Sequence, residues 1–420
     1  MAAPARMQRR GVNLIAYTHA ESGVGELGRL IFRMLQVAQV PTSLFSCAAA
    51  PSRQSQRFAG TATRRPFDRN LICATAEEIP KIYDILEGTV LSALPTIGYW
   101  PWEVDLFPEA MAASASKLTE VWTLSTHAAT AISQSVDIPV LVIPPYVETP
   151  SAQAAAHQHA RRDRPSFLFC FDMFSVFERK NPLAVVEAFV RAFPSADTAS
   201  LLIKVINGAH SPHQLATLIA AASDRPDIII RDGYLGAREQ AALVASCDCY
   251  VSLHRAEGFG FTMAEAMALS KPVIATGYSG NADFMDQSNS FLVPYTLVPV
   301  GEGHAPYPET ANWADPDIDQ AAQAMRVVVA DPERALETGR QARSDIATKH
   351  GLGRCAAQVA ERLGADPPPS VPVLPTRLQA IASAEIARSR LGGPRLRRMA
   401  SPLVRQGRRA VRRLRNVDSR

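Results

Sequence analysis

The stretch CDCYVSLHRAEGFGFTMAEAMALSKPVIAT, residues 247–276, decides the fold because it contains a complete strand–loop–helix–strand unit. Its apolar run CYVSLH predicts a strand, and a loop rich in small residues follows. We expect a helix to begin near Thr262, which would cap it, with Glu265 in the first turn as capping-box partner. PVIAT then predicts a second strand. A strand, a helix and a second strand in this order are typical of a parallel α/β sheet.

The same alternation extends through the preceding hundred residues or so. We predict strands at residues 166–171 (SFLFCF), 199–206 (ASLLIKVI) and 227–232 (DIIIRD). The helices between and after them are predicted at residues 181–193 (NPLAVVEAFVRAF), in the stretch that follows residue 206, and at residues 238–247 (REQAALVASC). A second series of short, continuously apolar runs lies nearer the N-terminus, as expected for parallel strands buried on both faces. These runs are Val12–Tyr17, Leu71–Ala74, Thr96–Tyr99, Glu120–Leu124 and Val140–Ile143.

The sequence therefore predicts an α/β protein with two tandem Rossmann-like domains facing a cleft. We assign residues 1–148 to the first domain and residues 166–350 to the second. The polar, Ala-rich and Pro-bounded residues 149–165 are interpreted as a linker. The segment SGVGELGRLIFRML at residues 22–35 predicts a glycine turn and then an amphipathic helix in the first domain.

The chain ends in a helical and Pro-rich segment, residues 351–387, and a basic tail, residues 388–420. The tail holds 12 arginines and one aspartate, so its own net charge is about +11. Because the whole chain has a net charge of +4, residues 1–387 together carry about −7. Three interpretations stay open: attraction to an anionic membrane surface, nonspecific nucleic-acid binding, or a disordered tail without a partner. No aromatic residues alternate with the arginines, so specific nucleic-acid recognition is not expected.

Composition excludes several classes of protein. The sequence contains no run of about 18 apolar residues, so it predicts no transmembrane helix. The first apolar run is too short for the core of a signal peptide. We therefore expect a cytoplasmic protein. Six scattered cysteines do not resemble a disulfide framework. Cys247 and Cys249 lack a second pair at zinc spacing, which favours two small buried residues over a metal site.

The loop between the strand and the helix predicts the chemistry. Its glycines would let backbone N–H groups approach a ligand, and a helix N-terminus favours phosphate. Glu257 and Glu265, eight positions apart, would repel phosphate, but they are suited to accept hydrogen bonds from hydroxyl groups. A ligand with phosphates between two polyols, a nucleotide sugar, satisfies both requirements.

The segment EGFGFTMAE resembles the E-x7-E motif of the retaining glycosyltransferases of family 4, within the glycosyl transferases group 1, which have the GT-B fold. The resemblance covers residues 11 to about 350. It is carried by SGVGELGR (22–29), YWPWEVDLFPEAM (99–111), EVWTLSTHAATAI (120–132), FERKNPL (177–183), CDCYVSLHRAEGFG (247–260), KPVIATGYSGNADFM (271–285) and WADPDIDQAAQAMR (313–326).

The resemblance implies roles for individual residues around the donor. Glu257 would contact the hydroxyls of the transferred sugar, and Glu265 the ribose hydroxyls. Lys180, with Arg179, would neutralise the diphosphate. The family usually has an arginine about five positions before this lysine, where Ser175 stands here. The resemblance therefore leaves open which of the two adjacent cations meets which phosphate.

Further donor contacts are implied by backbone position. Gly258, Phe259 and Gly260 would bring the main chain to the sugar and diphosphate, and Gly23 and Gly25 would approach the phosphates from the other domain.

Two residues are candidates on the acceptor side. His19 follows the first predicted strand, and Glu103 lies in WPWE, where an ion pair within its own domain is the alternative interpretation.

The reaction that the resemblance implies is retaining transfer from a nucleotide-diphosphate sugar to an unknown acceptor, such as a glycan or a lipid-linked saccharide of polysaccharide biosynthesis. It requires no metal and no cofactor. The letters DPD at 315–317 are interpreted as a structural helix start instead of a metal site. The alternatives are a GT-B epimerase or phosphorylase, and a non-catalytic protein that binds a nucleotide sugar.

Overall fold

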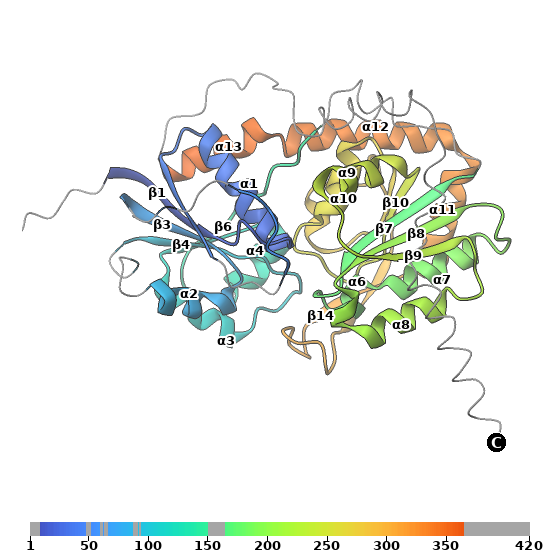
Figure 1. Ribbon diagram of the computed structural model, residues 1–420, viewed down its shortest axis with the longest axis horizontal. Helices are drawn as coiled ribbons and strands as arrows, with labels where there is room; N and C mark the ends of the chain where they lie inside the picture. The colour runs from blue at the N-terminus through green and yellow to red at the C-terminus, as the bar shows by residue number, and fades with distance from the viewer. Residues whose placement is uncertain are drawn as a thin grey trace, which may run out of the picture.

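The computed structural model describes residues 9–47, 52–58, 62, 66–86, 91, 94–149 and 164–364. Within these residues, two parallel six-stranded sheets form two α/β domains that lie side by side (Figure 1). The predicted linker lies mostly outside the described residues, and so do the Pro-rich segment and the basic tail. No helix in the described part of the chain is long and apolar enough to cross a membrane.

The N-terminal sheet has the strand order β2-β1-β3-β4-β5-β6. Its strands are β1 (Arg9–Ala16), β2 (Thr42–Ser46), β3 (Phe67–Cys73), β4 (Thr96–Tyr99), β5 (Glu120–Thr123) and β6 (Val140–Val142). Its helices are α1 (Gly23–Val37), α2 (Ile79–Leu86), α3 (Glu109–Ala112) and α4 (Thr126–Ser133). The sequence predicted five of these strands and missed β2, which carries only a short apolar core.

The C-terminal sheet has the order β12-β11-β10-β7-β8-β9. Its strands are β7 (Ser166–Asp172), β8 (Ser200–Ile206), β9 (Ile228–Asp232), β10 (Cys249–Ser252), β11 (Val273–Thr276) and β12 (Phe291–Val293). Its helices are α6 (Phe177–Lys180), α7 (Pro182–Ala192), α8 (Pro212–Ala221), α9 (Ala237–Ser246), α10 (Phe261–Ala268) and α11 (Ile318–Ala330). β10, β11 and most of β7 are buried, which explains why their sequences are apolar at consecutive positions.

A hairpin of β13 (Tyr295–Pro299) and β14 (Asn312–Pro316) follows the C-terminal sheet. No pattern in the sequence predicts it, because both strands are short and β13 is largely exposed. The interpretation of DPD as a helix start is confirmed, since Asp317 caps α11 and accepts a hydrogen bond from Gln320 N at 3.0 Å.

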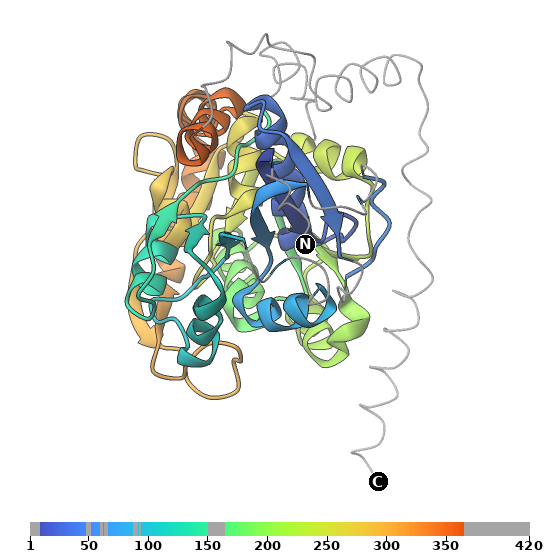
Figure 2. The same ribbon diagram turned by 90° about the vertical axis from the view of Figure 1, so that its left-hand side faces the viewer.

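Two C-terminal helices join the domains along one side of the molecule. α12 (Pro332–Lys349) lies over the C-terminal domain, and α13 (Leu352–Leu363) returns to pack against α1. Figures 1 and 2 place both helices on the side opposite α3 and α8. At the crossing between the domains, Val147 N donates to His350 O at 2.9 Å.

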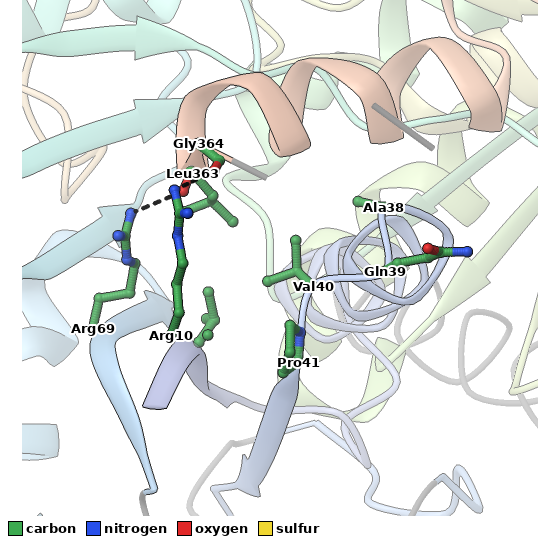
Figure 3. Close-up of a pocket in the computed structure, with 10 residues that line it drawn as sticks. Arg10, Ala38, Gln39, Val40, Pro41, Arg69, Leu363 and Gly364 are labelled. Atoms are coloured by element: carbon green, nitrogen blue, oxygen red, sulfur yellow. Dashed lines mark hydrogen bonds between the residues drawn. The ribbon is translucent and has the colours of Figure 1, made fainter. Parts of the chain in front are cut away.

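Arginines hold the C-terminal end of α13 against the N-terminal sheet. Arg10 donates to Gly364 O and Arg69 donates to Leu363 O at 3.5 Å (Figure 3). Arg362 also pairs with Glu120 on β5. Cations beside the last carbonyls of a helix are favourable, because these groups lack partners within the helix and carry partial negative charge.

Candidate active site between the domains

A cavity of about 630 Å³ lies between the domains, at the carboxyl ends of strands from both sheets. In the C-terminal sheet the order reverses between β7 and β10, which are hydrogen-bonded neighbours. Ligands of open α/β sheets bind at such a switch point. The loops after β7 and β10 supply most of the C-terminal wall, and the loops after β1 and β4 supply much of the N-terminal wall.

Glu257 lies in the loop after β10 and faces two cations from α6. Lys180 Nζ forms an ion pair with Glu257 Oε1, and Arg179 NH1 lies 3.6 Å from Oε2. Arg179 is buried and also donates to Ala256 O at 2.7 Å. Burial opposes the charge of Glu257, but Lys180 and Arg179 outweigh it and lower its pKa to about 2. The carboxylate is therefore ionised at neutral pH.

The turn that follows β11 supports this loop from behind. Gly280 N donates to Glu257 O at 2.8 Å, and Glu257 N donates to Ser279 Oγ at 2.8 Å. A Cβ on Gly280 would lie 2.2 Å from Gly258 O, so no larger residue fits here. The turn that contains Ser279 and Gly280 thus fixes the backbone of the loop that carries Glu257.

Glu265 lies further along the same wall, on α10. The expected cap at Thr262 is wrong: α10 begins at Phe261, and Gly260 occupies the cap position with φ +96°. A left-handed cap favours glycine. Glu265 therefore lies beyond the first turn, and it is not a capping-box partner.

The environment of Glu265 differs from that of Glu257. Its side chain is open to solvent in the cavity, yet protein surrounds the cavity on several sides. This confinement, with the charges of Glu26 and Glu148, raises its pKa to about 8. Solvent in the cavity limits the effect of this pKa shift on stability.

The N-terminal wall begins at the first turn of α1. The predicted glycine turn is wrong in detail, since Gly23 and Gly25 lie inside the helix and Ser22 caps it by accepting from Gly25 N at 3.2 Å. Gly23 lines the cavity and has open space at its Cβ position. Gly25 instead faces the loop behind it, where a Cβ would lie 2.2 Å from Ala20 O.

The acceptor-side candidates are placed differently. Glu103 lines the cavity, and its Oε2 accepts a hydrogen bond from Tyr307 OH at 3.1 Å. His19 is not among the lining residues. Its Nδ1 lies 2.8 Å from the carbonyl oxygen of Gln56, which does line the cavity.

Tyr307, which the sequence analysis missed, reaches the cavity from the loop between β13 and β14. Its ring contacts Trp102 edge to face, with ring centroids 5.4 Å apart. At the base of the same loop Asn312 N and Nδ2 donate to the Asp105 carboxylate at 2.6 and 2.9 Å. These contacts join residues about two hundred positions apart, so no local sequence pattern could reveal them.

The domains also meet closely at Gly258. A Cβ at this position would lie 3.0 Å from the carbonyl oxygen of Trp102, in the other domain. The glycine therefore permits a backbone-to-backbone approach across the cleft, between the two glutamates.

Comparison with known proteins agrees with this geometry. Residues 165–299 match the sequence model of the family described as glycosyl transferases group 1. The C-terminal domain is a group 1 glycosyltransferase domain. No curated protein sequence matches the chain.

Solved structures similar to the whole chain extend the comparison beyond this glycosyltransferase domain. Sucrose-phosphate synthase from Thermosynechococcus elongatus superposes with a TM-score of 0.61 at 16% identity, over 84% of this chain and 98% of that one. HepE from Anabaena, in complex with UDP and glucose, gives 0.59 at 14% identity, over 85% and 100%. These likenesses show the GT-B fold.

TarM from S. aureus, in complex with fondaparinux, alpha-GlcNAc-glycerol and UDP, is also similar, with a TM-score of 0.53 at 16% identity. The match covers 71% of this chain and 55% of TarM, so the chain spans little more than half the length of that protein.

No metal-binding cluster of three or more His, Cys, Asp or Glu side chains occurs in the described part of this GT-B protein. Cys247 and Cys249 are buried, as expected of small core residues. Ser175, at the position where an arginine is usual in the family resemblance, lines the cavity beside Arg179.

Proposed function

We propose that the protein is a retaining glycosyltransferase that moves a sugar from a nucleoside-diphosphate sugar to an acceptor hydroxyl. The observation that carries the proposal is the ionised Glu257, which Arg179 and Lys180 hold in the cavity. Glu265 lines the same wall of this cavity. The group 1 glycosyltransferase match supports it, as do the UDP and glucose bound to HepE.

Each end of this wall suits one part of the donor. Glu257, charged at neutral pH, accepts hydrogen bonds from hydroxyls of the transferred sugar. Glu265 accepts from the ribose hydroxyls. The main chain of Gly258, Phe259 and Gly260, at the start of α10, offers N–H groups to the diphosphate between them.

The N-terminal domain would approach the same diphosphate with a helix end. Gly23 opens α1 with open space at its Cβ position, and Ser22 Oγ accepts from Gly25 N in the same turn. Gly25 lets the helix begin close to the preceding loop. The positive end of the helix dipole would then stabilise the phosphates from across the cleft.

The reaction breaks the bond between the anomeric carbon and the diphosphate oxygen and forms a bond from that carbon to the acceptor oxygen. Attack comes from the face that the diphosphate leaves, so the configuration is retained. The departing diphosphate oxygen takes the acceptor proton. Arg179 and Lys180 stabilise the charge that develops on this leaving group, as preorganised donors do in other active sites.

The two cations supply the positive charge that a bound metal provides in other phosphate sites, so we propose a reaction without metal or cofactor. Burial lowers the pKa of Lys180, and Arg179 lowers it further, while Glu257 opposes both and favours the charged ammonium. The ion pair with Glu257 thereby favours the protonated form of Lys180, which can bind the diphosphate.

The acceptor enters beside the N-terminal wall. Glu103, which accepts a hydrogen bond from Tyr307, would accept another from the attacking hydroxyl, and His19 would act through the loop at Gln56. A glycan or a lipid-linked saccharide, as in polysaccharide biosynthesis, fits an acceptor that offers hydroxyls. The cytoplasmic location and the membrane contact of residues 388–420 stay predictions, and the tail lies outside the described residues.

The test is a screen of nucleotide sugars against mixed glycan and glycolipid acceptors, with release of nucleoside diphosphate and product mass as readouts. We expect turnover that persists in excess EDTA and a product whose anomeric proton coupling matches the donor configuration. An inverted product, or EDTA-sensitive turnover, would contradict the retaining or the metal-independent part. Products without acceptor, or dependent on free phosphate, would identify an epimerase or a phosphorylase.

A further inference from the structure

Lys204 is a buried lysine that the proposed transfer does not use. It lies on β8, is 3% exposed, and lines the cavity together with Tyr234 and Leu235, which follow β9. Its Cα pairs with that of Cys170 on β7 and that of Arg231 on β9, so it lies between these two strands near the carboxyl end of β8.

The ammonium of Lys204 is held by main-chain carbonyls. It donates to Val205 O at 2.7 Å and to Gly233 O. No ion pair involves it within the described residues. Asp232, the carboxylate whose charge acts on it, instead accepts from Gly208 N at 3.3 Å. Since an ammonium has three N–H donors, one donor remains beyond these two carbonyls.

Lys204 belongs to a different end of the cavity from the phosphate cations. Arg179 and Lys180 surround Glu257. By contrast, β7 separates Lys204 on β8 from β10, whose loop carries Glu257. Glu265, on the helix that follows β10, and Lys204, on β8, line the C-terminal wall of the same cavity. Beyond the ribose-binding carboxylate of a nucleotide comes the base.

We propose that Lys204 donates a hydrogen bond to O6 of guanine or O4 of uracil in the donor nucleotide and so selects one of these bases. The inference rests on the proposed function. An ammonium only donates, so it cannot accept from an amine. Adenine carries an amine where guanine carries a carbonyl, and cytosine carries one where uracil does. The two pairs of bases thus differ at the atom that the lysine reads.

The test is calorimetric binding of GDP, ADP, UDP and CDP to the full chain and to Lys204→Met, which keeps the length of the side chain and removes its donors. We expect the intact protein to prefer GDP over ADP, or UDP over CDP, by about 10- to 100-fold. In Lys204→Met this ratio should fall to within about threefold, chiefly through weaker binding of the carbonyl-bearing base.

Two further variants separate base reading from a general defect. Lys180→Met should weaken all four diphosphates together and leave their ratio unchanged, because it removes a phosphate contact. Lys204→Gln retains an N–H donor and should retain part of the preference, which also covers the case in which Lys204→Met does not fold. The melting temperature of each variant shows whether loss of the contacts with Val205 O and Gly233 O destabilises the fold, separately from any change in base preference.

The outcomes are distinguishable. If the intact protein binds ADP as tightly as GDP, and CDP as tightly as UDP, the inference is wrong. It is equally wrong if Lys204→Met weakens all four diphosphates by the same factor, which would make the lysine a structural tie between β8 and β9. If none of the four binds the intact protein, the proposed function itself fails.

Discussion

Two glutamates eight positions apart differ in charge although they line one cavity. Glu257 lies in the loop after β10, beside Arg179 and Lys180, and its pKa is lowered to about 2. Glu265 lies on α10, where confinement within the cavity and the charges of Glu26 and Glu148 raise its pKa to about 8. The cations beside Glu257, which Glu265 lacks, account for the opposite directions of the two pKa shifts.

This difference separates two tasks along the wall. A carboxylate fixed by two cations keeps its charge and its position, as required where bonds break. A carboxylate without such partners gains a full charge only at higher pH, or when a bound ligand donates hydrogen bonds to it. We therefore expect the Glu257 end to control the rate of reaction and the Glu265 end to control donor binding.

Lys180→Met tests the first half of this comparison and should have the largest effect. Loss of one charge-stabilising donor typically lowers kcat by about 100-fold or more. We expect that loss here, with a smaller change in the donor KM. Lys81→Met, on the exposed surface of α2, is the matched control and should react normally. A Lys180→Met protein with full kcat and an unchanged melting temperature would remove the cation from the mechanism.

Glu265→Gln tests the other half. The amide still accepts one hydrogen bond but loses the charge, so the donor KM should rise by about tenfold, with kcat within about threefold of the intact enzyme. Steady-state kinetics at saturating acceptor measure both constants, and Glu361→Gln on the exposed face of α13 is the control. A fall in kcat with unchanged KM would instead place Glu265 at the reacting centre.

The sequence predicted the C-terminal half of this site better than the N-terminal half. The strand–loop–helix unit at 247–276 carries Glu257, the glycines and Glu265 within one local pattern, so its placement followed from periodicity and turn chemistry. The cap of α10 was predicted at Thr262 because hydroxyl caps are common. Gly260 takes that place in the left-handed conformation, which a sequence pattern does not distinguish from an ordinary loop.

Tertiary contacts account for the rest. Tyr307 reaches Glu103 only because the loop of the β13–β14 hairpin crosses to the other domain. The cations of α6 meet Glu257 across 77 positions of sequence, and their expected role came from a family resemblance and not from spacing. The first contact depends on how the two domains dock, and the second on the pairing of β7 with β10 in one sheet. A local window of sequence encodes neither.

Gly258→Ala sharpens the comparison by disturbing the space between the two glutamates. The added Cβ would lie 3.0 Å from Trp102 O, so the domains must separate by a few tenths of an ångström. We expect kcat/KM to fall by about three- to tenfold with little change in melting temperature, because the crowding arises between domains and not within one. Gly277→Ala, whose Cβ would meet nothing nearer than 3.6 Å, should be neutral in both assays. Equal activity of the two variants would mean that the cleft tolerates the separation.

The dependence of stability on pH should reveal the two carboxylates with opposite signs. Glu257 has a folded-state pKa below its ordinary 4.5, so its contribution is present above that pH and is lost as the pH falls toward 2. Glu265 has a folded-state pKa above 4.5, so the folded protein holds its proton more tightly than the unfolded chain does. Its contribution is present below 4.5 and is lost as the pH rises toward 8.

Urea unfolding between about pH 5 and pH 8.5 isolates the second effect, because Glu257 is ionised in both states there. The free energy of unfolding of the intact protein should fall with pH relative to that of Glu265→Gln, which cannot titrate. The difference should be below about 1 kcal/mol, since solvent reaches the Glu265 carboxylate. Parallel curves for the two proteins would show that Glu265 is ionised like any surface glutamate, and the contrast between the two ends of the wall would then rest on the cations of α6 alone.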